Sequence, residues 1–132
     1  MISWLLGLVL FAEADPWDRW VESVRWRARI VFVLSDDPAF IRAQRQRWNG
    51  AEAGFEERHL QAIFIGPKGA GLDDAPLPRA VIKAHVEQGV TLMGKDGDFK
   101  AKSPRPVAIE WLFERIDAMP MRRREMRKPS AP

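Results

Sequence analysis

Five successive apolar residues, from Ile30 to Leu34, constrain the fold of this chain more than any other stretch. Together with Arg29 they predict a β-strand over Arg29–Leu34, because most of them are β-branched or aromatic. No polar residue alternates with the apolar ones, so both faces of this strand are expected to be buried. A strand covered on both faces lies in a sheet with helices on either side, which favours an α/β fold.

One amphipathic helix is predicted before this strand and one after it. Asp15 and Pro16 are typical of an N-cap and a first helical residue, and Asp37 and Pro38 repeat this pattern. Apolar residues then recur at three- and four-residue spacing. In the first helix these are Trp17, Trp20, Val21 and Val24, and one side of the second carries Phe40, Ile41, Gln44, Trp48 and Ala51.

The second half of the chain predicts another strand, a hairpin and a last helix. The Asp96-Gly97 pair is a typical hairpin turn, and Pro106 opens a final helix that ends at Pro120. The elements before that helix are a strand over Leu60–Ile65, a loop at 68–78, a short helix at 79–87, and strands at 90–93 and 99–101. The buried stripe of the final helix comprises Ile109, Leu112, Phe113 and Ile116.

The first 14 residues predict a signal peptide. Ile2–Phe11 is apolar, and Ala12-Glu13-Ala14 has the small-x-small pattern that signal peptidase prefers. The run is too short to anchor the chain in a bilayer, so a periplasmic or secreted protein without a transmembrane anchor is expected after cleavage. The alternative is that this run is a first buried element of the domain.

The chain contains no cysteine. Disulfides, thiolate metal sites and thiol nucleophiles are therefore excluded.

Several short motifs stand out along the chain. They are IDAMPMRRREM at Ile116–Met126, LMGKDG at Leu92–Gly97, Arg25-Trp26, Gln44-Arg45 and Glu57–Leu60. Together they resemble a bacterial family known as domain of unknown function 4174, described as peroxiredoxin-like with a thioredoxin-type fold. Two departures are His59, where the family commonly has an acidic residue, and the absence of a basic residue before the apolar run. The resemblance implies an exported protein, related to domains in animal sushi-repeat and coiled-coil-domain extracellular matrix proteins, and attaches no activity.

The predicted order β-α-β-α-β-β-α is that of the thioredoxin core, with a mixed sheet of about four strands over a domain at 15–118. In that fold the reactive thiol lies where the first strand meets its helix, and here this junction reads Ser35, Asp36, Asp37. The cis-proline expected before the third strand is replaced by Gly89-Val90. Thiol–disulfide exchange is excluded. As an N-cap, Asp37 needs no further role, although a cleft at the junction remains a candidate binding site.

The positive charge concentrates in a predicted C-terminal tail at 119–132. Five cations, Arg122, Arg123, Arg124, Arg127 and Lys128, stand there against Glu125. This segment is either a solvated tail or an interface with an anionic lipid surface or an acidic protein. Nucleic acid is not expected as a partner, because aromatic residues do not interleave with the basic ones.

Other motifs are better explained without a ligand. Met119 and Met121, with Met126, have thioethers that suit copper(I), but packing is the better account. The glycine-rich Gly66–Gly71 lacks the Gly-Lys-Ser/Thr ending of a phosphate loop, and His59 and His85 match no metal-ligand spacing. No metal or cofactor is therefore expected.

Three hypotheses follow. The first is an exported, non-catalytic binding domain, whose candidate surface comprises Ser35, Asp36, Asp37, Met119, Met121, Arg122, Arg123 and Arg124. The second is an enzyme that uses Asp36, Asp37, Lys95 and Asp96 as acids and bases. The third is a purely structural module.

Overall fold

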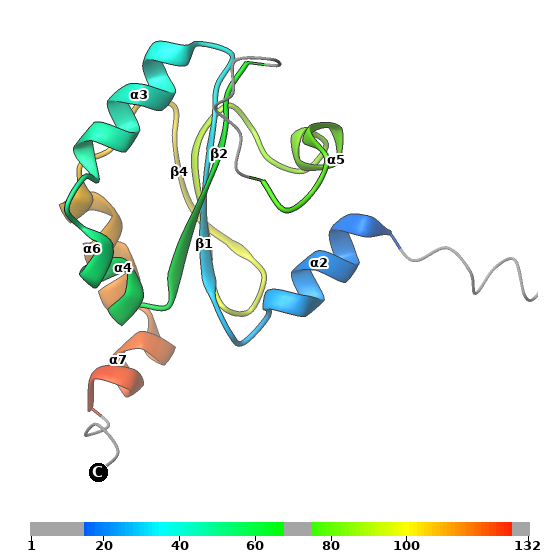
Figure 1. The fold of residues 1–132 in the computed structure, drawn as a ribbon. Coiled ribbons are helices and arrows are strands. Elements are labelled where there is room, and N and C mark those ends of the chain that lie inside the picture. The colour runs from blue at the N-terminus through cyan, green and yellow to red at the C-terminus, as the bar shows by residue number, and fades with distance from the viewer. Residues whose placement is uncertain (1–14, 68–74, 128–132) are drawn as a thin grey trace, which may run out of the picture.

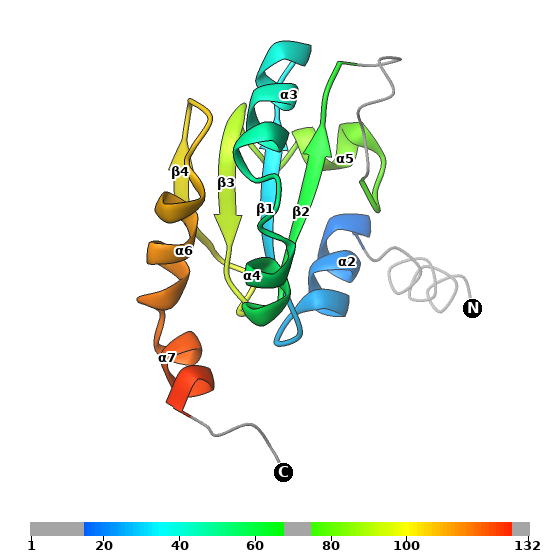
Figure 2. The same cartoon turned by 60° about the vertical axis from the view of Figure 1, so that its left-hand side comes forward.

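Four strands form one mixed sheet in the order β2-β1-β3-β4 (Figure 1), which Figure 2 shows from the side of α3 and α4. In the computed structural model, which describes residues 15–67 and 75–127, β1 pairs in parallel with β2 and antiparallel with β3. β3 and β4 form an antiparallel hairpin. The strands are β1 (Arg29–Leu34), β2 (Leu60–Ile65), β3 (Gly89–Met93) and β4 (Phe99–Ser103). The predicted α/β class and four-stranded mixed sheet are confirmed, whereas the expected signal peptide at 1–14 lies outside the described residues.

Helices cover both faces of this sheet (Figures 1 and 2). On one face lie α2 (Pro16–Val24) and α5 (Arg79–Lys83), and on the other lie α3 (Pro38–Arg47), α4 (Glu52–Glu57) and α6 (Ile109–Asp117). The alternation of a strand sends Ile30, Phe32 and Leu34 into the first core and Val31 and Val33 into the second. All six residues of β1 are buried. The apolar run Ile30–Leu34 predicts this for five of them, and Arg29 is buried as the partner of Glu125.

The two helix starts predicted from Asp-Pro pairs are confirmed. The side chain of Asp15 accepts a hydrogen bond from the Trp17 amide (2.8 Å), and that of Asp37 accepts one from the Ala39 amide (2.9 Å). In both helices the proline occupies the first turn, where its missing N–H costs nothing.

The second predicted helix ends earlier than its apolar pattern suggests. Trp48 is the C-cap of α3, and Ala51 is the N-cap of the separate helix α4, which the sequence pattern does not predict. Gly50 lies between them with a φ of +82°, a left-handed conformation that ends a helix. Two other helices are shorter than predicted: α5 ends at Lys83, and α6 begins at Ile109.

Gln44 connects α3 to the segment before α6. Its side chain is fully buried among apolar residues, where an unpaired amide would be costly. The Nε2 group donates to the carbonyl of Val107 and Oε1 accepts from the amide of Val107, both at 2.8 Å. Both polar ends of the side chain are therefore satisfied.

The segment predicted as a basic tail forms helix α7 (Pro120–Arg127). Helix α6 ends at Asp117, earlier than the predicted end at Pro120, and Pro120 instead occupies the first position of this new helix. The interpretation as a solvated tail is wrong for Arg122, of which only 4% is exposed. The reason is a set of carboxylates on neighbouring elements that hold α7 in place. Lys128 and the residues beyond it lie outside the described part of the chain.

Candidate functional site

The predicted junction site at the end of β1 consists of locally satisfied side chains. Ser35 is buried, and its Oγ accepts a hydrogen bond from the amide of Asp37 (3.0 Å). Asp36 accepts one from Gln88 (3.0 Å) and lies 3.7 Å from the ammonium of Lys83. Asp37 caps α3. The three residues therefore serve the turn and the helix start, and their role in binding stays a prediction.

The four residues of the enzyme hypothesis do not form one site. Asp36 and Asp37 follow the carboxyl end of β1, where Leu34 lies opposite Gly89. Lys95 and Asp96 belong to the β3–β4 turn, which lies beside the beginning of β1 because Ile30 pairs with Met93. The length of β1 separates the two pairs.

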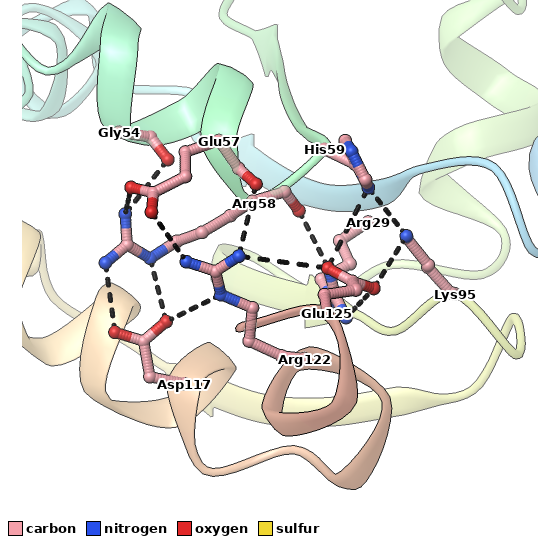
Figure 3. Close-up of polar contacts among 9 residues, drawn as sticks. All are labelled: Arg29, Gly54, Glu57, Arg58, His59, Lys95, Asp117, Arg122 and Glu125. Atoms are coloured by element: carbon pink, nitrogen blue, oxygen red, sulfur yellow. Dashed lines mark hydrogen bonds and ion pairs between the residues drawn. The ribbon is translucent and has the colours of Figure 1, made fainter. Parts of the chain in front are cut away.

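The motifs that carry the family resemblance meet at this amino end of β1 instead. Figure 3 shows a cluster of ion pairs, here termed the basal cluster, drawn from four separate parts of the sequence. Its charged members are four cations and three carboxylates, with one histidine beside them. They are Arg29, Glu57, Arg58, His59, Lys95, Asp117, Arg122 and Glu125.

Glu125 on α7 is the centre of one half of the basal cluster. Its two oxygens accept hydrogen bonds from Arg29 at 3.1 and 3.0 Å, and Oε2 also accepts one from Lys95 at 2.8 Å (Figure 3). Burial would raise the pKa of Glu125, but the hydrogen bonds and positive charges of Arg29 and Lys95 outweigh it and lower the pKa to about 2. The carboxylate therefore stays ionised across the physiological range.

Asp117 at the end of α6 is the centre of the other half. Its carboxylate receives two hydrogen bonds from Arg58 (3.0 and 2.9 Å) and one from Arg122 (3.1 Å). Burial opposes ionisation here too, yet the two guanidinium groups lower the pKa of Asp117. The guanidinium of Arg122 also lies 3.2 Å from the side-chain carboxylate of Glu57 and donates a hydrogen bond to the main-chain carbonyl of Glu57, also at 3.2 Å. This half fastens α7 to α6 and α4.

His59 lies at the edge of the basal cluster. Its Nδ1 is 2.7 Å from the Nζ of Lys95 and 3.8 Å from Oε1 of Glu125. Because an ammonium group can only donate, Nζ of Lys95 is the donor in this contact and Nδ1 of His59 the acceptor. His59 also has a left-handed φ of +50° in the tight turn between α4 and β2. Its ring thus connects the basal cluster to the surface.

That surface is an open groove of about 740 Å³ beside β2. Its apolar lining includes Trp48, Phe55 and Phe64. The ring of Trp48 contacts those of Phe55 and Phe64, with centroids 5.7 and 6.0 Å away, and the guanidinium of Arg45 lies 4.0 Å above the ring of Phe64. The polar lining carries both signs of charge. It comprises Arg27, Arg45, Asn49, Glu52, Glu56, His59 and Gln61. The combination of an apolar floor and a few polar groups is typical of binding sites.

The methionines and arginines of the predicted tail have different surroundings. Met119 packs against the core beneath α3 and α6, in agreement with the packing interpretation, and Met121 is partly buried. Arg123 and Arg124 are exposed, whereas Arg122 is not. Of the predicted binding surface in this segment, Arg123 and Arg124 are therefore exposed, whereas Met119 and Arg122 contribute to packing and ion pairing within the domain.

The two histidines lie in different environments. His59 contacts Lys95, whereas the ring of His85 stacks on Trp17 with centroids 4.5 Å apart. In the described part of the chain, no three His, Cys, Asp or Glu side chains are grouped in a way that would hold a metal ion. Within residues 15–67 and 75–127, no helix combines the length and the apolar character needed to span a bilayer.

Sequence reasoning missed both the basal cluster and the groove. The signal for the cluster was present, since three motifs of the resemblance each contain charged residues, but nothing in their spacing indicates that they converge. The groove depends on the break at Gly50 and on helix α4, neither of which the apolar pattern predicts.

Comparison with known proteins gives one result. The family model described as Domain of unknown function (DUF4174) matches residues 21–125, most of the chain, so the chain belongs to this family. No curated protein and no solved structure matches it. Every residue of the basal cluster lies within the matched range, and so does the groove.

Proposed function

We propose that this member of the DUF4174 family is an exported, thioredoxin-like domain that binds a polypeptide partner and catalyses no reaction. The thioredoxin-like assignment is supported by the strand order β2-β1-β3-β4 and by the parallel connection from β1 to β2 through α3 and α4. The antiparallel hairpin of β3 and β4 and the helices on both faces complete that architecture.

Export is supported by the apolar run Ile2–Phe11 and the Ala12-Glu13-Ala14 pattern. Expression of the full chain in a bacterium, followed by fractionation and N-terminal sequencing, tests this part of the proposal. The expected product lies outside the cytoplasm and begins at Asp15. A cytoplasmic protein that retains residue 2 would contradict it.

The absence of catalysis is supported by the way the buried charges are paired. Glu125 stays ionised down to a pKa of about 2, so it is neither an acid nor a base near neutrality. Lys95 is 7% exposed and donates to both Glu125 and His59. Without cysteine, the chain is not a thiol oxidoreductase.

The observation that carries the proposal is that the groove runs along an open edge of the sheet. The amides of Arg29 and Ser35 donate to the carbonyls of His59 and Ile65, at 2.8 and 3.0 Å. Because strand residues alternate in direction, the odd-numbered residues of β2 bond to β1. The N–H and C=O groups of Leu60 and Ala62 therefore point away from the sheet, and both residues line the groove.

Such an edge can accept an extended polypeptide as an additional strand. The main chain of the guest would bond to Leu60 and Ala62, and alternate side chains would enter the groove beside Trp48 and Phe55. The groove therefore fits an extended segment with apolar residues at every second position.

A displayed library of random twelve-residue peptides tests this proposal, with the purified protein as bait. Selected peptides are then titrated against the wild type and two variants, Ala62→Glu and Gln46→Glu. Ala62 lines the groove on the side of the α3–α4 core, whereas Gln46 is exposed on α3 and does not line the groove.

We expect Ala62→Glu to weaken binding at least tenfold, because it places a charge in the apolar groove, and Gln46→Glu to change it less than threefold. Selection of no peptide, or equal losses in the two variants, would contradict the proposal.

A second candidate function is docking on an anionic lipid surface. Trp26 and Met126 are 60% and 48% exposed, the exposed large apolar side chains of the described residues. Both adjoin the basal cluster, since the amide of Trp26 donates to the carbonyl of Lys95 (2.7 Å) and Met126 follows Glu125. Arg123 and Arg124 are exposed on the same helix as Met126. Co-sedimentation with vesicles that contain phosphatidylglycerol, but not with neutral ones, would support this candidate.

A further inference from the structure

The two edges of the sheet are protected to very different degrees. At one edge β4 carries the exposed residues Lys100 and Lys102, and its pairing with β3 is interrupted by a register shift at Leu92/Met93. Exposed lysines and bulges are devices by which proteins prevent a second chain from adding to an edge.

Within residues 15–67 and 75–127, the other edge has none of these devices. β2 reads Leu-Gln-Ala-Ile-Phe-Ile, without a charge or a proline, and its ladder with β1 continues without a shift from Leu60 to Ile65. Leu60 and Ala62 also turn main-chain donors and acceptors outward. By the same physical rule, this edge is open to pairing with another strand.

We infer that the strand that covers it is β2 of a second copy of this chain. The inference rests on the proposed function, since it identifies the partner of the same groove. The two strands run antiparallel about a two-fold axis at Gln61, so that Leu60 of each copy lies opposite Ala62 of the other. Each such pair exchanges two main-chain hydrogen bonds, and the two four-stranded sheets join into one.

Two features make this surface complementary to itself, as a two-fold interface requires. Gln61 is exposed and is the polar residue of β2, and its amide is both donor and acceptor, so two copies facing each other across the axis can bond to one another. The groove also carries cations and carboxylates together, with Arg27 and Arg45 against Glu52 and Glu56. A surface of one sign would repel its own copy, whereas this one does not.

The absence of native cysteine allows a direct test of the register. In the Gln61→Cys variant, the two introduced thiols lie directly opposite each other at a Cα separation of about 4.5 Å, which suits a disulfide. In the matched Ala62→Cys variant they are offset diagonally by roughly 7–8 Å, beyond the usual range. Both purified variants are oxidised with glutathione disulfide at equal concentration and followed on non-reducing gels.

We expect the Gln61→Cys variant to form a covalent dimer at least tenfold faster than the Ala62→Cys variant. Equal rates, or dimerisation of neither variant, would overturn the inference.

Sedimentation velocity of the unmodified protein gives an independent test. The wild type should sediment as a concentration-dependent dimer, and Gln61→Glu should weaken the dimer roughly fivefold or more, because like charges would lie directly opposite each other. Gln46→Glu is the matched control, since Gln46 is exposed on α3 and does not line the groove. A monomeric wild type at all concentrations, or equal effects of the two variants, would overturn self-pairing.

These outcomes are distinct from a failure of the proposed function. A monomer whose groove still selects peptides disproves only the second copy as partner. A dimer whose stability does not respond to Gln61→Glu disproves pairing through β2, and the peptide titrations then decide on the groove separately.

Discussion

The guanidinium of Arg29 and the carboxylate of Glu125 meet in two parallel hydrogen bonds, although 96 residues separate them in the sequence. Arg29 begins the central strand and is 1% exposed, whereas Glu125 lies on the last helix. A buried guanidinium without a counter-charge would be strongly destabilising, so this pair makes helix α7 a necessary part of the domain.

Replacement of Glu125 by glutamine should therefore destabilise the protein strongly. The change leaves Arg29 and Lys95 without a carboxylate, and we expect a loss of roughly 3 kcal/mol in the free energy of unfolding, at the low end for a buried pair because Glu125 is 22% exposed. Urea denaturation measures it. Glu114→Gln, at an exposed position of α6, should change the free energy by less than about 0.5 kcal/mol, and comparable losses would contradict the prediction.

The stability of the wild type should also fall in acid. The pKa of Glu125 is lowered from 4.5 to about 2 by folding, so its contribution is complete above pH 4.5 and is lost as the pH falls to about 2. The difference amounts to roughly 3 kcal/mol. Asp117, whose pKa is also lowered, adds a loss of the same sign. Thermal unfolding from pH 6 to pH 2 should show a steeper decline for the wild type than for Glu125→Gln, and parallel curves would disprove the assignment.

Adjacent arginines of α7 should respond very differently to truncation. Arg122 bonds to Asp117 and Glu57, so Arg122→Ala should lower the stability by roughly 3 kcal/mol. Arg123→Ala and Arg124→Ala remove exposed side chains and should change it by less than about 0.5 kcal/mol. Melting temperatures of the three variants suffice as a measurement. Similar values for all three would mean that α7 is not held by Arg122.

Gly89 should not tolerate a side chain. Its φ is +114°, and a Cβ at this position would clash with the main-chain carbonyl oxygen of Ser103. We expect Gly89→Ala to cost more than about 3 kcal/mol, since backbone strain and a backbone clash add. Gly50 has a similar φ of +82° but open space around it, so Gly50→Ala should cost only about 1–2 kcal/mol. Denaturation of both variants separates the clash from the strain, and equal losses would contradict the contact with Ser103.

The parts of the fold that the sequence predicts are those determined by local chemistry. The apolar run at β1 and the Asp-Pro pairs before α2 and α3 act within a few residues, and the structure agrees with each. Helix α7 could not be predicted because its arginine-rich sequence has almost no apolar face. Ion pairs between α7 and the residues Asp117, Glu57 and Arg29 stabilise this helix. These partners lie in other elements of the fold, and two of them are far away in the sequence. Prediction of the groove would require knowing where α3 ends and α4 begins, and the left-handed conformation of Gly50 determines this break.

The order in which the chain is synthesised gives the Arg29–Glu125 pair a kinetic meaning. In a growing chain, Arg29 is made 96 residues before Glu125. Until Glu125 is present, burial of the central strand would remove water from the guanidinium of Arg29 without supplying a carboxylate in its place. Local helices and the β3–β4 hairpin can form earlier, because their contacts are short in sequence. Closure of the domain around β1 therefore depends on the presence of helix α7, and a chain that ends before α7 leaves the guanidinium of Arg29 without its carboxylate.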